Sequence, residues 1–275
     1  MKITIIGLGL IGASLAKSLQ GKARITGVDR NPESVRLAIS DGIVHSGGDN
    51  PALSEGSDMI VISVPVCSIV DTVRTVIPHI REETIITDTG STKAHIVQEM
   101  DSIWPNFVGS HPIAGREHPG YAASDADLFR DAYTIMTPGP SPRDHAIQQV
   151  KWLWHSCGAT TIEMNPDQHD ELMARISHMP HLLSFASMCM AQDLTFHKKL
   201  LGAGFRDFTR IAASDPIMWR DILLDNRDHV LPLLDRYMQE LKTLRKRIEA
   251  GLDSDLARML EGYAQIRRSL YEGDR

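Results

Sequence analysis

Short apolar runs alternate with amphipathic stretches along the first 164 residues of the chain. The apolar runs predict strands at residues 2–6, 25–28, 59–64, 84–88, 107–109, 133–136 and 160–162. Segments with apolar residues at helical spacing lie between them, among them residues 67–77 and 93–100. Repeated units of strand and helix predict an α/β fold with a mostly parallel, doubly wound sheet.

The strand pattern stops at Asn165, and the rest of the chain has the pattern of helices. Asn165 and Pro166 suit a helix start, because Asn caps the first turn and Pro is favoured at the first helical position. The sequence therefore predicts an α/β domain at residues 1–164 and an all-helical domain at residues 165–275.

Two apolar stripes at helical spacing near the end of the chain predict a dimer. They consist of Leu231, Leu234, Leu241, Leu244 and Ile248, and of Leu256, Leu260, Tyr263, Ile266 and Leu270. An amphipathic helix buries such a stripe against a partner surface, and two of them favour an intertwined homodimer. Packing within one chain is the alternative.

The run Gly-Leu-Gly-Leu-Ile-Gly at residues 7–12 follows the first strand and leads into a helix. Gly7 permits a tight turn, Gly9 lets the backbone approach a pyrophosphate, and Gly12 lets the helix pack closely on the sheet. Phosphates would meet the free amides at the positive end of the helix that begins near Leu10. A flexible turn is the alternative, but the strand, the helix and the later carboxylate of Asp29 together favour a dinucleotide site.

Asp29 and Arg30 bear on the choice of dinucleotide. A carboxylate at the end of the second strand accepts hydrogen bonds from the ribose hydroxyls of NAD and repels the 2′-phosphate of NADP. Arg30 would suit that phosphate, but we interpret it as a solvated residue stacked over adenine. The sequence thus predicts NAD, bound by Gly7, Leu8, Gly9, Leu10, Ile11, Gly12, Asp29 and Arg30.

Composition narrows the class of protein. The chain has 275 residues, is 42% hydrophobic and carries a formal net charge of -6, without the basic excess of nucleic-acid-binding proteins. Neither a membrane-spanning run of about eighteen apolar residues nor a secretory signal pattern is present in the sequence. Cys67, Cys157 and Cys189 are odd in number and widely spaced, which favours reduced thiols and a cytoplasmic protein.

His111 follows a short predicted strand, in the run Gly-Ser-His-Pro-Ile-Ala-Gly at residues 109–115. Ligands of an open α/β sheet bind beyond the carboxyl ends of its strands, so a neutral imidazole here can act as a general base during hydride transfer. A capping or solvated histidine is the alternative. Ser91, in the loop after the preceding strand, either orients His111 or holds a substrate hydroxyl. The alternative is that Ser91 or Thr92 merely caps the helix that begins at Lys93, and the two roles can coexist.

Arg206 and Arg210 lie four residues apart in the helical region and share a helix face. Guanidinium groups bind carboxylates in a bidentate manner, so the pair indicates an acidic small-molecule substrate. A solvated charged face, paired with Asp207 or Asp221, is the alternative.

Several motifs together resemble one known family, the prephenate and arogenate dehydrogenases of tyrosine biosynthesis. They are the glycine-rich start, the loop at residues 88–93, His-Pro-Ile-Ala-Gly at 111–115, Ser-His-Met-Pro-His at 177–181 and Gly-Phe-Arg-Asp-Phe-Thr-Arg at 204–210. The resemblance covers nearly the whole chain and implies a Rossmann-type NAD domain followed by a helical dimerisation domain. It also implies NAD-dependent oxidative decarboxylation of prephenate, a dicarboxylate, to 4-hydroxyphenylpyruvate and carbon dioxide.

The same resemblance implies roles for individual residues. His111 would be the base with Ser91 as its hydroxyl partner, Arg210 would bind a substrate carboxylate, and Arg206 lies where the family also carries cationic residues. His181 would contact the substrate, with a core histidine as the alternative. Glu117 would hold the amino group of arogenate or control the access of prephenate, unless it is simply an acid on a surface loop.

Other functions remain open at this point. His178 and His181 lie three residues apart, but no third ligand is apparent, so we expect no metal site. Arogenate is the alternative substrate, and a 3-hydroxyacid dehydrogenase or a non-catalytic nucleotide sensor are alternative functions. The chain has no length for a fused regulatory domain, so any inhibition by tyrosine is expected to act at the active site.

Overall fold

The computed structural model describes residues 1–116, 118–140, 143–192, 200–251 and 253–271. It contains two compact units, residues 1–227 and residues 228–275. The first unit contains the sheet and the helices around it, and the second contains most of the last two helices.

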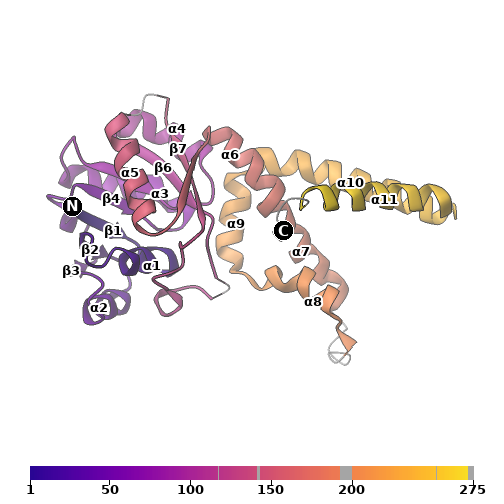
Figure 1. Cartoon of the computed structure of the whole chain (residues 1–275), viewed down its shortest axis with the longest axis horizontal. Coiled ribbons are helices and arrows are strands. Elements are labelled where there is room, and N and C mark those ends of the chain that lie inside the picture. The colour runs from indigo at the N-terminus through magenta and orange to yellow at the C-terminus, as the bar shows by residue number, and fades with distance from the viewer. Residues whose placement is uncertain (117, 141–142, 193–199, 252, 272–275) are drawn as a thin grey trace. The chain divides into compact units, whose positions relative to one another are not determined.

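Within the described residues, the first unit is built on an eight-stranded sheet (Figure 1). Its strands are β1 (Lys2–Ile6), β2 (Arg24–Val28), β3 (Ser46–Gly48), β4 (Met59–Ile62), β5 (Ile85–Asp88), β6 (Phe107–Pro112), β7 (Tyr133–Pro138) and β8 (Thr160–Glu163). They lie in the order β3-β2-β1-β4-β5-β6-β7-β8, and only the β6–β7 pairing is antiparallel. The doubly wound, mostly parallel sheet is therefore confirmed.

The strand order reverses direction between β1 and β4. In a doubly wound sheet the connections on either side of such a point leave in opposite directions, which opens a crevice at the carboxyl ends of the two strands. The glycine-rich turn follows β1 and Ser63 follows β4, so both segments face this crevice.

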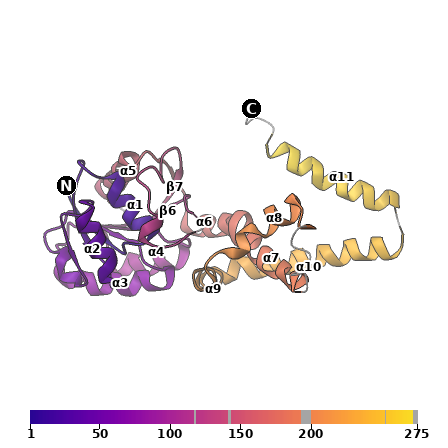
Figure 2. The ribbon, with the colours of Figure 1, turned by 90° about the horizontal axis from the view of Figure 1, so that it is seen from below.

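Helices cover both faces of the sheet. On one face lie α1 (Leu10–Ser18), α2 (Pro32–Ser40) and α5 (Asp144–Ser156), and on the other α3 (Ile69–Val76) and α4 (Ala94–Ile103), as Figure 2 shows for α5 and α3. Side chains alternate between the faces, so in β4 Met59 and Val61 pack in one core while Ile60 and Ile62 pack in the other. Every residue of β4 is therefore apolar and buried.

Helices follow after Asn165, whose side chain accepts hydrogen bonds from the amides of Asp167 and Gln168, as the sequence predicts for a cap. They are α6 (Pro166–Met173), a π-helical turn at Ala174–His178, α7 (Met179–Ser187), α8 (Ala203–Thr209) and α9 (Pro216–Asp225). Pro180 lacks an amide to donate and its ring crowds the preceding turn, which accounts for the π turn just before it.

The last two helices are α10 (Arg227–Glu249) and α11 (Asp253–Ser269). Leu231, Leu241, Ile248, Leu260 and Ile266 of the two predicted stripes are exposed in the single chain. Among the described helices, none combines the length and the apolar character needed to cross a membrane.

Some predicted boundaries were wrong. His111 lies inside β6 rather than after it, and a 3-10 turn at Val66–Ser68 precedes α3. The short strand β3 was missed because its Ser-Gly-Gly sequence carries no apolar signal.

Candidate functional site

Two glycines of the turn after β1 are required by the fold itself. Gly7 has a φ of 96°, its amide donates to the carbonyl oxygen of Val28 at 2.8 Å, and an added Cβ would overlap the carbonyl oxygen of Ser63. A Cβ on Gly12 would overlap the carbonyl oxygen of Gly7. Any other residue at either position would push α1 or β4 away from β1.

Gly9 differs from its two neighbours in the motif. It precedes α1 with a φ of -73° and a ψ of -160°, and a Cβ built there would meet no protein atom within 4 Å. Among the described residues, no side chain caps this helix start. The first amides of α1 are therefore open to an anion, and the missing Cβ leaves room for a pyrophosphate to approach them.

Asp29 directly follows β2 and bonds back to the glycine-rich turn after β1. Its carboxylate accepts the amide of Leu8 at 2.5 Å and the amide of Asn31 at 2.7 Å. Each carboxylate oxygen keeps a further lone pair, so the ribose hydroxyls of a nucleotide can still donate to it. Asp29 and Arg30 line a cavity of about 500 Å³ together with Gly7 and Gly9.

A second cavity of about 380 Å³ continues from the first. Both are lined by Gly9, Ser63 and Val64, and the second extends to Ser91 and Arg116. Leu10 and Ile11 also line it. Together the two cavities form a cleft along the carboxyl ends of the strands at the switch point, where a dinucleotide binds in this class of sheet.

His111 is half-buried near the end of β6, one strand away from the loop that carries Ser91. Its Nδ1 lies 2.9 Å from Nε2 of His169 on α6, and Nδ1 of His169 lies 2.7 Å from the carboxylate of Asp170. Burial holds the pKa of His111 well below its usual range, and the positive charge of Lys93 acts in the same direction. His111 is therefore neutral and able to accept a proton near pH 7.

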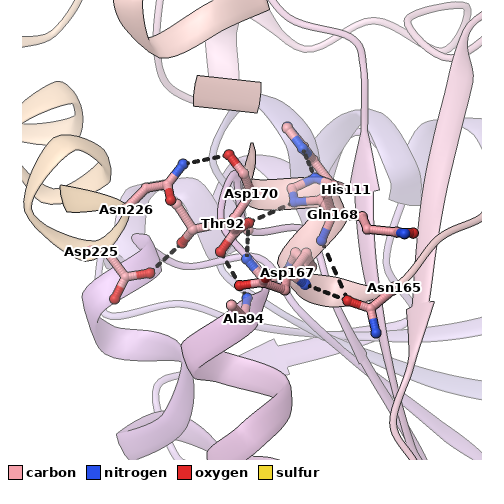
Figure 3. Close-up of polar contacts among 12 residues, drawn as sticks. Thr92, Ala94, His111, Asn165, Asp167, Gln168, Asp170, Asp225 and Asn226 are labelled. Carbon is pink, nitrogen blue, oxygen red and sulfur yellow. Dashed lines mark hydrogen bonds and ion pairs between the residues drawn. The ribbon is translucent and has the colours of Figure 1, made fainter. Parts of the chain in front are cut away.

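The start of α4 is capped from a distant helix. The carboxylate of Asp170 accepts the amides of Lys93 and Ala94, each at 2.8 Å (Figure 3). The expectation that Ser91 or Thr92 caps this helix is wrong, and the Thr92 hydroxyl donates to Asp225 instead. Asp170 thus joins α6 to α4 directly behind His111.

Lys93 and Asp88 form a fully buried ion pair beside this cap. Asp88 also accepts the amides of Gly90 and Ser110, at 2.8 and 3.0 Å. Burying a charged pair is costly unless further hydrogen bonds offset the loss of water, and these two amides do so for the Asp88 carboxylate. The pair fixes the loop at residues 89–93 against β6, and so fixes Ser91 relative to His111.

His181 lies on α7 in the helical region. Its ring stacks on buried Trp219 with centroids 3.6 Å apart, and its Nδ1 donates to the carbonyl oxygen of Ser177 at 2.9 Å. Burial lowers the pKa of His181, and the positive charge of Arg210 contributes to the shift. His181 is thus a neutral acceptor close to a cationic group.

The structure shows fewer contacts for the other residues that were predicted to bind the substrate. Arg206 is exposed on α8, and Arg210 is exposed at the 3-10 turn that follows that helix. Within the described part of the chain no hydrogen bond joins Ser91 to His111, although Ser91 lines the second cavity. Glu117 lies outside the described residues.

Sequence reasoning missed the polar residues behind His111. They are His169, Asp170 and Asn226, whereas Asp88, Lys93 and His178 lie in motifs that were recognised without this role. Asn226 donates to the carbonyl oxygen of Asp170 at 2.8 Å and lies 2.9 Å from Nδ1 of His178. No local sequence pattern marks His169 and Asp170, because their burial and their bonds are visible only in the folded structure.

Comparisons with known proteins identify the family. The model for the prephenate dehydrogenase nucleotide-binding domain matches residues 13–163, and the model for the prephenate dehydrogenase dimerization domain matches residues 165–262. Prephenate dehydrogenase of Bacillus subtilis is 36% identical over 264 residues, which are 90% of this chain and 71% of that protein.

Solved structures agree with the sequence matches. Prephenate dehydrogenase of Aquifex aeolicus, in complex with hydroxyphenyl propionate and NAD+, superposes with a TM-score of 0.91 at 33% identity and covers 98% of both chains. Arogenate dehydrogenase of Synechocystis superposes with a TM-score of 0.85 at 28% identity, over 98% of this chain and 100% of that chain. The chain therefore belongs to the prephenate dehydrogenase family.

Proposed function

We infer that the protein is an NAD-dependent prephenate dehydrogenase, which converts prephenate to 4-hydroxyphenylpyruvate and carbon dioxide. The observation that carries this conclusion is a neutral, half-buried histidine, His111, near the end of β6, the neighbour of β5, whose following loop lines a cleft that suits a dinucleotide. Relatives named for this activity align with most of the chain.

The residues of the cleft fit NAD. The space beside Gly9 is free of protein atoms, the first amides of α1 face it, and Asp29 retains acceptor capacity for ribose hydroxyls. When bound, NAD supplies the hydride acceptor of the reaction. Asp29 disfavours a 2′-phosphate at the same position, which favours NAD over NADP.

We propose that His111 removes the proton of the substrate hydroxyl as hydride leaves the same carbon. The resulting dienone loses its ring carboxylate as carbon dioxide, because the ring becomes aromatic. The protein therefore has to take one proton, align the carbinol carbon and hold two carboxylates. Burial of His111 keeps it unprotonated for the first of these tasks.

We propose that Arg210 holds a substrate carboxylate and that Arg206 adds positive charge nearby, with His181 contacting the substrate from its stacked position on Trp219. The charge of Arg210 acts on His181, which supports a common substrate side. Ser91 lines the cleft and would bind the substrate hydroxyl. Glu117 remains a proposed specificity residue.

A direct assay with each of the two substrates tests this function. The purified protein is mixed with NAD and either prephenate or arogenate, and the appearance of NADH and of carbon dioxide is followed. We expect turnover of prephenate. Arogenate is the second candidate, because the Synechocystis relative is an arogenate dehydrogenase. Release of NADH without carbon dioxide would contradict decarboxylation.

We also propose that residues 1–164 bind NAD and that residues 165–275 supply substrate contacts and a homodimer interface. Exposed apolar side chains of α10 and α11, such as Leu241, Leu260 and Ile266, support the interface. Leu241→Glu should shift the molar mass measured by light scattering from dimer to monomer, while Thr243→Glu on the same helix should not. The three free cysteines favour a cytoplasmic location.

A further inference from the structure

Three side chains form a line of hydrogen bonds that ends at His111. The Asp170 carboxylate lies 2.7 Å from Nδ1 of His169, and Nε2 of His169 lies 2.9 Å from Nδ1 of His111. His169 is fully buried and Asp170 is 2% exposed. His169 and Asp170 reach the proposed base through the hydrogen bond between Nε2 of His169 and Nδ1 of His111.

We propose that His169 and Asp170 are positioning residues, which fix the tautomer of His111 so that its Nε2 carries the lone pair that accepts the substrate proton. The proposal rests on the proposed role of His111 as the base and adds the reason why the correct nitrogen is free.

The assignment follows from which groups can donate. An ionised carboxylate only accepts, so Nδ1 of His169 must carry the hydrogen that it shares with Asp170. A neutral imidazole carries one hydrogen, which leaves Nε2 of His169 as an acceptor. The hydrogen between the two rings must then belong to Nδ1 of His111. Its other nitrogen, Nε2, is therefore unprotonated.

This tautomer of His111 depends on an ionised Asp170. Burial alone would raise the pKa of Asp170, but the hydrogen bonds from His169 and from the amides of Ala94 and Lys93 outweigh it and lower the pKa. Figure 3 shows these bonds meeting at Asp170. The same amides hold the carboxylate in place, so its orientation toward His169 does not depend on the histidine.

The tautomer of His111 also depends on a neutral His169. Burial lowers the pKa of His169 and outweighs the opposing effect of Asp170, and the positive charge of Lys93 lowers it further. A doubly protonated His169 would donate from both nitrogens, and His111 would then be forced into the opposite, non-basic tautomer.

The ring geometry directs the free nitrogen away from this cluster. The rings of His111 and His169 meet edge to face, with an interplanar angle of 69° and centroids 5.1 Å apart. The two nitrogens of an imidazole point to different sides of the ring, so engaging Nδ1 leaves Nε2 facing away from His169. When Nε2 takes the substrate proton, Nδ1–H keeps its bond to His169, and no proton moves along the line.

Nitrogen NMR of the protein labelled with ¹⁵N-histidine tests the tautomer directly. We expect a protonated, pyrrole-type Nδ1 and an unprotonated, pyridine-type Nε2 for His111 at neutral pH, with the signals assigned by their loss in His111→Asn. A protonated Nε2 in the neutral ring would overturn the proposal. This readout needs no turnover, so it stands apart from any failure of the proposed reaction.

Kinetics of two variants test the positioning role. His169→Leu removes the acceptor and should lower kcat by about 10- to 100-fold with KM for both substrates unchanged, which is the usual size of effects from residues behind a functional group. His169→Gln offers an amide oxygen to Nδ1–H of His111 and should recover most of the loss. His155→Leu, on the exposed side of α5, is the matched control and should leave kcat unchanged. A folded His169→Leu protein with wild-type kcat would refute the positioning role. If that variant does not fold, the NMR measurement of the His111 tautomer decides the question.

Discussion

Replacing Gly9 by Ala separates the structural and the ligand-binding roles of the glycine-rich turn. The backbone of Gly9 is extended, with φ of -73° and ψ of -160°, which Ala adopts without strain. Ala is a poorer residue than Gly at a helix start, by at most about 1 kcal/mol. It also has fewer conformations in the unfolded chain, which stabilises by about 0.4–1 kcal/mol. The free energy of unfolding should therefore change by less than about 1 kcal/mol.

The same methyl group should weaken nucleotide binding. It projects into the cleft, where no protein atom lies within 4 Å, so it occupies space that a pyrophosphate needs. An extra methyl in a tight contact costs about 1–3 kcal/mol. Because about 1.4 kcal/mol corresponds to a tenfold change, the Kd for NAD should rise by about fivefold to 150-fold.

Gly12→Ala is the matched control, because its methyl group would meet the protein instead of the ligand. The new Cβ would overlap the carbonyl oxygen of Gly7 and lie 3.1 Å from Cγ2 of Ile5. Backbone atoms cannot yield as a flexible side chain does, so we expect a loss of about 2 kcal/mol or more in the free energy of unfolding. We therefore expect opposite patterns: Gly9→Ala keeps its stability and loses affinity for NAD, whereas Gly12→Ala loses stability.

The measurements are urea unfolding without nucleotide, followed by tryptophan fluorescence, and titration calorimetry with NAD. A Gly9→Ala protein that is as stable as wild type and binds NAD with the same Kd would refute the placement of the pyrophosphate beside Gly9. A Gly12→Ala protein of wild-type stability would refute the packing of α1 on β1.

Three further predictions concern the catalytic and helical regions. His111→Asn should lower kcat by about 10²- to 10⁴-fold with little change in KM, as expected for loss of a general base, and steady-state kinetics would exclude this if both parameters stayed at wild-type values. Arg210→Ala should instead raise KM for prephenate strongly with a smaller effect on kcat, because it removes binding common to the ground and transition states; Arg175→Ala, on the exposed side of the π turn, should change neither. Burial lowers the pKa of His178 to about 4, so the folded protein binds fewer protons than the unfolded chain below about pH 6.5, and stability is lost as pH falls from there toward 4. His178 alone should reduce the free energy of unfolding by about 2 kcal/mol between pH 7 and pH 5, and a urea midpoint independent of pH over that range would contradict its neutral burial.

The dinucleotide site was predictable because the residues that specify it lie close together in the sequence. A strand, a turn and a helix within residues 2–18 are specified by neighbouring residues, and Asp29 follows within the same strand–helix–strand unit. The physical constraints on Gly7 and Gly12 are close contacts inside that unit, which glycine alone satisfies. Sequence spacing is therefore enough to identify them.

The group that caps α4 was not predictable in this way. A local pattern offers Ser91 and Thr92 as caps, yet the amides bond to Asp170, which lies 76 and 77 positions away. The carboxylate is buried and held by several donors, so it competes better for those amides than a hydroxyl on the loop. That choice exists only once α6 packs against α4.

The sequence by itself thus predicted the alternation of strands and helices apart from β3, the dinucleotide site at the glycine-rich turn and the candidate base His111 on β6. Only the tertiary structure placed His169 and Asp170 behind His111, because the His111–His169 contact joins residues 58 positions apart. The direction of a proton depends on which hydrogen-bond partner each nitrogen meets, and those partners come from different elements of the fold.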